Sequence, residues 1–180
     1  QQPVKAGLPV QVKEHFAATV RLAKDAPSVD KVPVEPPTRS SLDTCRDDIY
    51  KVFFHGPAYQ VLECAGAAQG QAVGALPDDL PAELAHKEPN GKSVLMAPRL
   101  IESLFQAAAF WNIKQKGAMA FPLGIGSVTT YRPLESANGK RLYAVVTTPD
   151  EGHSFDGRVV DDEGDVYVEL RGYRTVSRPA

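Results

Sequence analysis

The chain has 180 residues, of which 43% are hydrophobic and 23% are charged, and its formal net charge is −2 at pH 7. This length and apolar content fit one ordinary domain with a hydrophobic core and exclude a disordered chain. Because Lys and Arg are scattered and form no basic stripe, we expect no nucleic-acid partner.

Membrane and disulfide signals are also weak. No apolar run is long enough to cross a bilayer, and residues 1–16 lack the pattern of a signal peptide, so we expect a soluble, cytoplasmic protein with no membrane partner. Cys45 and Cys64 have neither CxxC spacing nor a His cluster nearby. This predicts two free thiols and no metal site.

The first part of the chain predicts a strand and a linker. Residues 15–23 are β-compatible and alternate weakly, which favours a strand. Residues 24–41 hold four prolines and no apolar period, which is typical of an extended linker or a strap over a surface. Apolar residues at helical spacing then predict a short helix over residues 42–50.

A pair of strands and a long helix follow. Residues 59–76 mix β-formers with small residues and glycines, as two curved strands joined near residues 68–70 would. Residues 77–93 read as a polar loop with a turn signal at Asn90-Gly91. The helix begins at Pro98, whose missing N–H has no partner to lose at a first helical position.

Apolar side chains surround this helix almost completely, so it should lie at the centre of the core. Strand-like runs then cover residues 120–134, 141–149 and 155–176, with a hairpin turn at Asp161–Asp165. One long helix and about five or six strands predict an α+β fold in which a curved antiparallel sheet wraps a helix.

Two polar residues, Glu102 and Gln106, stand four apart on the apolar helix. This spacing puts them on one side, where they can hydrogen-bond or converge on a common target. Burial raises the pKa of a carboxyl group while an amide donor and the helix N-terminus lower it, and this balance can poise a general acid near neutral pH. The alternative is that Glu102 only favours the helix start and reaches solvent past Arg99.

A histidine in FFHGPAYQ, residues 53–60, forms a second candidate. Gly56 permits backbone geometries closed to other residues and Pro57 stiffens the turn, so the imidazole of His55 should be held in a fixed direction. A purely structural role for this lone histidine remains the alternative.

Four segments together resemble the C-terminal half of the dehydratase domains of type I polyketide synthases and polyunsaturated fatty acid synthases. FFHGPAYQVL resembles the YGPxFQ motif of that family, and APRLIESLFQA resembles its HPxLLDxxLQ helix. FPLGIGSVTTY resembles its P-ϕ-x-ϕ-x-x-V strand, and the closing DDEGDVYVELRGYR also matches. The resemblance covers about residues 48–174 and is specific, because the motifs agree in order and spacing.

The resemblance implies a hot-dog fold, two copies of which pack as a double hot dog in this family. The N-terminal unit supplies a catalytic His in an HxxxGxxxxP motif, and the C-terminal unit supplies an Asp from its central helix. Together they remove water from a β-hydroxyacyl chain on the phosphopantetheine of an acyl carrier protein, giving an α,β-enoyl thioester. No metal or organic cofactor is implied.

By position, the catalytic Asp of the family corresponds to Glu102, its steadying Gln to Gln106, and its Tyr before Gly-Pro to His55. The motif residues that the resemblance implies in substrate binding are Gly56, Pro57, Tyr59, Phe105, Pro122 and Leu123.

The chain departs from the family in two ways. Glu102 is one methylene longer than Asp, which moves the carboxyl group by about 1 Å, and a misplacement of that size can cost roughly a hundredfold in rate. None of the histidines begins HxxxGxxxxP: His15, His55, His86 and His153. We therefore expect a fragment or half-dehydratase, in which residues 1–41 are the last strand and linker of a preceding unit and residues 42–180 are the C-terminal hot dog.

The expected partners are an acyl carrier protein with its acyl chain and the N-terminal hot-dog unit of the same synthase. A homodimer is an alternative assembly, because a lone hot dog exposes a sheet edge and a tunnel mouth. Two other functions stay open: a non-catalytic acyl-binding or scaffolding hot dog, and a hot-dog thioesterase in which Glu102 activates water.

Overall fold

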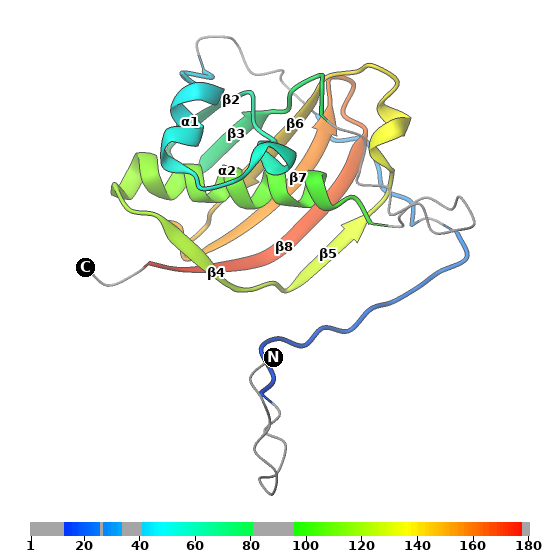
Figure 1. The fold of residues 1–180 in the computed structure, drawn as a ribbon. Coiled ribbons are helices and arrows are strands. Elements are labelled where there is room, and N and C mark those ends of the chain that lie inside the picture. The colour runs from blue at the N-terminus through cyan, green and yellow to red at the C-terminus, as the bar shows by residue number, and fades with distance from the viewer. Residues whose placement is uncertain (1–12, 26, 34–40, 81–95, 178–180) are drawn as a thin grey trace, which may run out of the picture.

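One long helix, α2 (Pro98–Lys116), lies along the inner face of a curved antiparallel sheet (Figure 1). The computed structural model describes residues 13–25, 27–33, 41–80 and 96–177. Pro98 begins α2 as expected, and Gly117 ends it in the left-handed conformation with φ of 66°. The predicted α+β hot-dog fold, a sheet wrapped around a central helix, is confirmed.

The sheet has the strand order β1-β2-β3-β6-β7-β8-β4, and β5 also pairs with β8. Every pairing is antiparallel. The strands are β1 (Thr44–Cys45), β2 (Cys64–Ala68), β3 (Gln71–Ala75), β4 (Ala120–Gly124), β5 (Ser127–Thr130), β6 (Leu142–Thr147), β7 (Ser154–Asp161) and β8 (Val166–Ser177).

The helix is close to the sheet because small residues face it. Leu104 is fully buried, and a Cβ on Gly157 of β7 would come within 3.1 Å of a Leu104 methyl group. Phe155 and Val159 extend the same core along β7, at the alternate positions that face one side of a strand. The mostly apolar circumference of α2 is therefore buried, as the sequence predicts.

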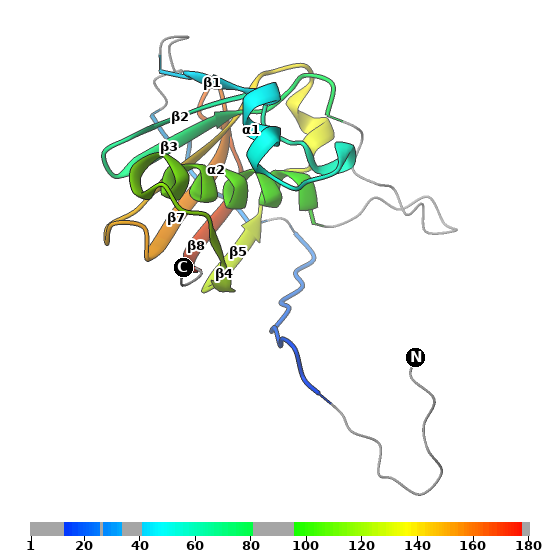
Figure 2. The same cartoon turned by 60° about the vertical axis from the view of Figure 1, so that its left-hand side comes forward.

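The segment before β2 packs against one flank of α2. It contains α1 (Arg46–Val52) and the short 3-10 helix η1 (Pro57–Tyr59), which lie on the same side of α2 in both views (Figures 1 and 2). Ile49 and Phe53 pack with Phe110 of α2 in one apolar cluster. The second 3-10 helix, η2 (Leu134–Ala137), connects β5 to β6. This packing sets the position of the candidate site.

Residues 27–33, called here the strap, contact the turn between β7 and β8. The N–H of Val32 donates to the carbonyl of Gly164 over 3.0 Å, and Lys31 pairs with Asp165 over 3.3 Å. Gly164 has φ of 83°, and a Cβ there would collide with the carbonyl oxygen of Val32. The interpretation of the proline-rich tract as a strap over a surface holds for these residues.

Three expectations from the sequence need correction. Residues 15–23 form no strand in this structure and are exposed, because no neighbouring strand accepts their backbone groups here. The short helix is α1 at Arg46–Val52 instead of residues 42–50, since Thr44 and Cys45 pair with β2. Cys45 faces Cys64 in that pairing and the two form a disulfide, so the prediction of free thiols is wrong.

Other expectations hold or lie outside the described residues. The hairpin turn at Asp161–Asp165 and the strand pair joined at Gly70 are confirmed. The Asn90-Gly91 turn falls outside the described residues. No described helix combines the length and apolar character needed to span a membrane. The assignment of residues 1–41 to a preceding unit stays a prediction.

A buried carboxylate organises the β7–β8 turn. Asp161 is fully buried and accepts hydrogen bonds from the backbone N–H groups of Glu163 and Asp165, from the Lys140 ammonium and from the Tyr167 hydroxyl. Burial alone would raise the pKa of Asp161, but these donors outweigh burial and the pKa is lowered. Its contribution to stability is present above the unfolded pKa and is lost as pH falls through the folded value.

Replacing Asp161 by Ala should lower the free energy of unfolding at pH 7 by about 2 to 4 kcal/mol, because two turn N–H groups and a tyrosine hydroxyl lose their acceptor. Urea unfolding at pH 7 measures this loss. The exposed neighbour Asp162 provides the control, and Asp162→Ala should change stability by less than about 0.5 kcal/mol. Equal unfolding midpoints for the two variants would contradict the prediction.

Candidate active site

Glu102 and Gln106 lie one turn apart on α2 and are hydrogen-bonded. The Gln106 Nε2 donates to Glu102 Oε1 over 3.1 Å. The Glu102 side chain is 22% exposed, while Gln106 is fully buried. The predicted convergence of the two groups is therefore present, and the alternative in which Glu102 only reaches solvent does not describe the structure.

The segment between α1 and η1 brings His55 against the same carboxylate. His55 Nε2 lies 3.0 Å from Glu102 Oε1. The imidazole stacks on Phe54 with ring centroids 4.7 Å apart and meets the Phe53 ring edge-on at 5.7 Å. The side-chain amide of Gln60 donates to the His55 carbonyl over 3.2 Å. The imidazole direction is thus fixed, as the Gly-Pro sequence predicts.

The hydrogen bonds of His55 indicate what it can do. Its Nδ1 is buried and has no hydrogen-bond partner within the described part of the chain. An unpaired buried N–H costs more than an unpaired ring lone pair, so we place the proton of a neutral His55 on Nε2, where it donates to Glu102. Nε2 then already carries a proton, and the lone pair of Nδ1 is buried, so neither nitrogen is placed to take a proton from a substrate. His55 does not replace the base that HxxxGxxxxP supplies in the family.

The electrostatics of Glu102 favour a carboxyl group that holds its proton. Burial raises the pKa of Glu102, and the donors Gln106 and His55 offset part of that increase. Both hydrogen bonds fall on Oε1. Among the described residues, Oε2 accepts none. Oε2 is therefore the oxygen on which a protonated Glu102 carries its proton.

Tyr50 of α1, which sequence reasoning missed, completes the cluster. Its hydroxyl donates to Gln106 Oε1 over 2.8 Å and accepts the backbone N–H of Leu62 over 2.9 Å. Burial raises the pKa of Tyr50 to about 12, so the phenol stays protonated. The short helix was predicted, but its docking against α2 was not, and no local signal singled out Tyr50.

Tyr173 of β8 is a second neighbour that the sequence did not reveal. Burial raises its pKa, and the charge of Glu102 raises that pKa further. The Tyr173 ring packs on Phe105 with centroids 4.7 Å apart. Phe105, predicted to bind substrate, thus lies on an aromatic wall beside the carboxylate.

The other predicted substrate residues divide into two groups. Gly56 and Pro57 are exposed at the start of η1, and the Tyr59 carbonyl accepts Gln106 Nε2 over 2.8 Å. Pro122 and Leu123 are exposed on β4, on the other side of α2 from η1 (Figure 1). The structure therefore brings Gly56, Pro57 and Tyr59 to the cluster and leaves the β4 pair apart from it.

Arg99 at the start of α2 contacts two residues of η1. It is 1% exposed, its Nε donates to the Ala58 carbonyl over 2.8 Å, and its guanidinium lies over the Tyr59 ring at 5.7 Å. Because Arg99 is itself buried, Glu102 does not extend past it into solvent, and the Glu102 side chain stays mostly buried at 22% exposure. Arg99 instead helps to hold η1 against the helix.

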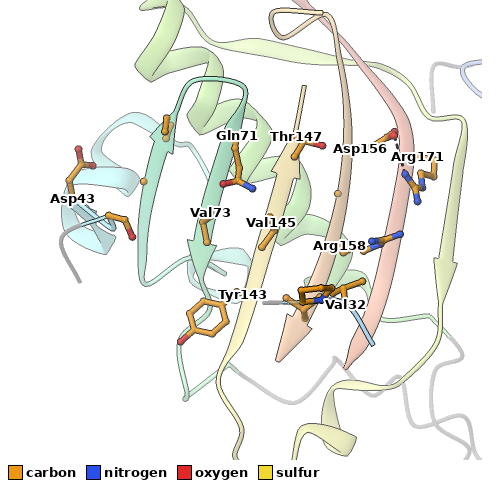
Figure 3. A pocket seen from close by; sticks show the side chains of 17 residues that line it. Val32, Asp43, Gln71, Val73, Tyr143, Val145, Thr147, Asp156, Arg158 and Arg171 are labelled. Atoms are coloured by element: carbon orange, nitrogen blue, oxygen red, sulfur yellow. Dashed lines mark hydrogen bonds and ion pairs between the residues drawn. The ribbon is translucent and has the colours of Figure 1, made fainter. Parts of the chain in front are cut away.

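A groove with a volume of about 660 Å³ lies on the other face of the sheet, away from α2 (Figure 3). Gln71, Val73, Val145 and Arg158 line it, together with the strap residue Val32. None of the predicted site residues is among its lining residues. The described residues also contain no group of three side chains suited to hold a metal ion.

The fold and the site together define a hot-dog protein whose central helix carries a clamped carboxyl group. A family model described as "Polyketide synthase dehydratase N-terminal domain" matches residues 24–180, which is most of the chain. The chain belongs to the polyketide synthase dehydratase family.

Solved structures show the same fold at low identity. The dehydratase domain from the CurF module of the curacin polyketide synthase is 19% identical with a TM-score of 0.64, and the match covers 84% of this chain and 54% of that one. The dehydratase domain of MlnD from Bacillus amyloliquefaciens is 18% identical with a TM-score of 0.58, covering 85% and 55%.

A trans-AT polyketide synthase dehydratase domain from Brevibacillus brevis is 16% identical with a TM-score of 0.58, covering 87% of this chain and 55% of that one. The chain thus spans about half the length of these dehydratase domains. Among curated proteins, none matches this sequence.

Replacing Glu102 by Gln should raise the free energy of unfolding at pH 8 and leave it nearly unchanged at pH 4. The pKa of Glu102 is raised by folding, so the unfolded chain releases this proton first and stability falls as pH rises toward the folded value. Gln carries no charge and keeps an oxygen acceptor for Gln106 and His55. Urea unfolding at both pH values measures the difference.

The exposed Glu135 supplies the matched control, because Glu135→Gln should not change the pH dependence of unfolding. A Glu102→Gln variant less stable than the parent at pH 8 would show that the ionised carboxylate is favourable in the fold.

Proposed function

We propose that the chain is the carboxylate-bearing, C-terminal hot-dog unit of a dehydratase domain. In this proposal it removes water from a β-hydroxyacyl chain on an acyl carrier protein and leaves an α,β-enoyl thioester. The single observation that carries the proposal is Glu102, which is held by Gln106 and His55 through Oε1 and has Oε2 available.

The choice of the C-terminal unit rests on motifs. The matching family model is described as an N-terminal domain, yet no histidine of the chain begins HxxxGxxxxP. The chain instead has a carboxylate on its central helix and a Gln four residues later, the arrangement that resembles the C-terminal unit. We assign the chain to the C-terminal unit on these catalytic groups and not on the words of the family description, because the two units contribute different groups to the reaction.

The proposed reaction divides the proton transfers between two units. A histidine of the N-terminal unit takes the α-proton, and the electron pair left behind forms the carbon–carbon double bond. The bond from the β-carbon to the hydroxyl oxygen breaks as Glu102 Oε2 gives up its proton, so one molecule of water leaves. The raised pKa of Glu102 supports this role because burial shifts the carboxyl group toward its protonated form, the form that can act as an acid.

Exposed apolar side chains supply a surface for the partner unit. Phe54 is 78% exposed beside the cluster, and Leu123 is 62% exposed on β4. Large apolar side chains that are exposed to solvent often mark a surface that another protein covers. In the proposal the N-terminal unit covers these side chains, Phe54 on one side of α2 and Leu123 on the other, and Leu123 contacts substrate or partner only after the two units pack.

Dehydration should require both units and Glu102. We expect turnover of a β-hydroxyacyl thioester by this chain joined to the N-terminal unit of its synthase, no turnover by this chain alone, and a loss of about a hundredfold or more for Glu102→Gln in the joined protein. Mass spectrometry detects the loss of water.

Glu135→Gln in the joined protein is the control and should turn over normally. Undiminished dehydration by Glu102→Gln would remove the role proposed for the carboxyl group. Release of free thiol instead of enoyl thioester would identify a thioesterase.

A non-catalytic acyl-binding unit is the second candidate, and one observation favours it. His55 stands where the family has Tyr, and its hydrogen bond to Glu102 occupies one carboxylate oxygen in the absence of substrate. Calorimetric titration with an acyl pantetheine separates the candidates: binding without turnover in the joined protein supports this second function, and absence of binding counts against it.

A further inference from the structure

A directed chain of hydrogen bonds runs from the backbone before β2 to the carboxyl group of Glu102. The N–H of Leu62 donates to the Tyr50 hydroxyl over 2.9 Å, and that hydroxyl donates to Gln106 Oε1 over 2.8 Å. Gln106 Nε2 then donates to Glu102 Oε1 over 3.1 Å and to the Tyr59 carbonyl over 2.8 Å.

The direction of this chain follows from the number of protons available. A backbone N–H only donates, so the Tyr50 oxygen accepts from Leu62 and has one proton left to give. That proton goes to Gln106, which makes the atom facing Tyr50 the amide oxygen. The amide nitrogen must then face Glu102.

The opposite orientation of the amide is unfavourable for two reasons. It would place Gln106 Oε1 against two other acceptors, Glu102 Oε1 and the Tyr59 carbonyl. It would also leave the Tyr50 hydroxyl proton facing an N–H₂ group. Because Gln106 is fully buried, water does not relieve either conflict.

We propose that Tyr50 is a positioning residue for the reaction: it selects the one orientation of the Gln106 amide that donates to Glu102. The proposal rests on the proposed function only in taking Glu102 as the reacting group. Tyr50 itself touches neither substrate nor the reacting oxygen Oε2, and it acts through Gln106.

Among the described residues, the titratable groups that interact with Glu102 come from three segments of the chain. His55 comes from the segment before η1, Tyr50 from α1 and Tyr173 from β8. Both tyrosines have raised pKa values and stay neutral below about pH 10. Below that pH, the titration midpoint of Glu102 therefore depends on its burial, on its hydrogen bonds and on the neighbouring His55, and not on ionisation of a tyrosine.

The test is the titration of the Glu102 carboxyl carbon by NMR in this chain with ¹³C-labelled glutamate, with the signal assigned by its absence in Glu102→Gln. In Tyr50→Phe, the titration midpoint should move to higher pH by about half a unit or more, because the Gln106 amide is no longer held in the orientation that donates to the ionised carboxylate. Tyr143→Phe removes the hydroxyl of another buried tyrosine, on β6, and should leave the midpoint unchanged.

A double-mutant cycle tests whether Tyr50 acts through Gln106. Gln106→Met should raise the midpoint by itself, and adding Tyr50→Phe should then change it no further. An unchanged midpoint in folded Tyr50→Phe overturns the proposal. The proposal is also overturned if Tyr50→Phe shifts the Glu102 midpoint equally in the parent chain and in Gln106→Met.

The unsubstituted chain provides a test that does not depend on a variant folding. Both side-chain amide protons of Gln106 are hydrogen-bonded in the structure, so both should exchange slowly with solvent. Fast exchange of either proton overturns the proposal. These measurements use no substrate, so they are independent of whether the joined protein dehydrates a thioester.

Discussion

A carboxyl group on a helix that is buried almost all round is the constraint on which the rest of the site depends. Leu100, Leu104 and Ala108 fill the interface between α2 and the sheet, so a polar side chain on this helix has few directions open to it. Glu102 lies on the flank that α1 and η1 cover, where Gln106 of α2 itself and His55 of the segment between α1 and η1 both contact its Oε1. The packing of that segment against α2 therefore adds a second donor to the one that the helix supplies.

The two oxygens of Glu102 have different surroundings, and this asymmetry suits proton transfer. Oε1 is fixed by two N–H donors, which aim the group without consuming its second oxygen. Burial favours the protonated form, while the donors favour the ionised form. The two effects oppose each other, and burial is the larger, so the pKa of Glu102 is raised. Perturbed carboxyl groups of this kind are frequent at functional sites and also occur in structural networks.

The sequence predicted the parts of the fold and site that local pattern controls. The all-apolar helix, its proline start and the spacing of Glu102 and Gln106 are readable because they depend on residues a few positions apart. Tyr50 was not readable, since its role depends on where α1 docks, which the pairing of Thr44–Cys45 with β2 sets over a long range. The same pairing explains the missed disulfide. Residues 15–23 carry a strand-like pattern, but a strand needs a neighbour, and the described chain gives them none.

The disulfide between Cys45 and Cys64 has a consequence for how the site is built. Its sequence separation is 19. Among the described residues outside α2, the ring it closes contains all that hydrogen-bond the polar pair or support that bonding: Tyr50, His55, Tyr59 and Leu62. The site is thus formed by two parts of the chain, the helix α2 and the loop that the Cys45–Cys64 disulfide closes. Closure limits the conformations of the loop even in the unfolded chain. Reduction would remove this covalent constraint from all four contributors at once, while the spacing of Glu102 and Gln106 on their helix would stay the same.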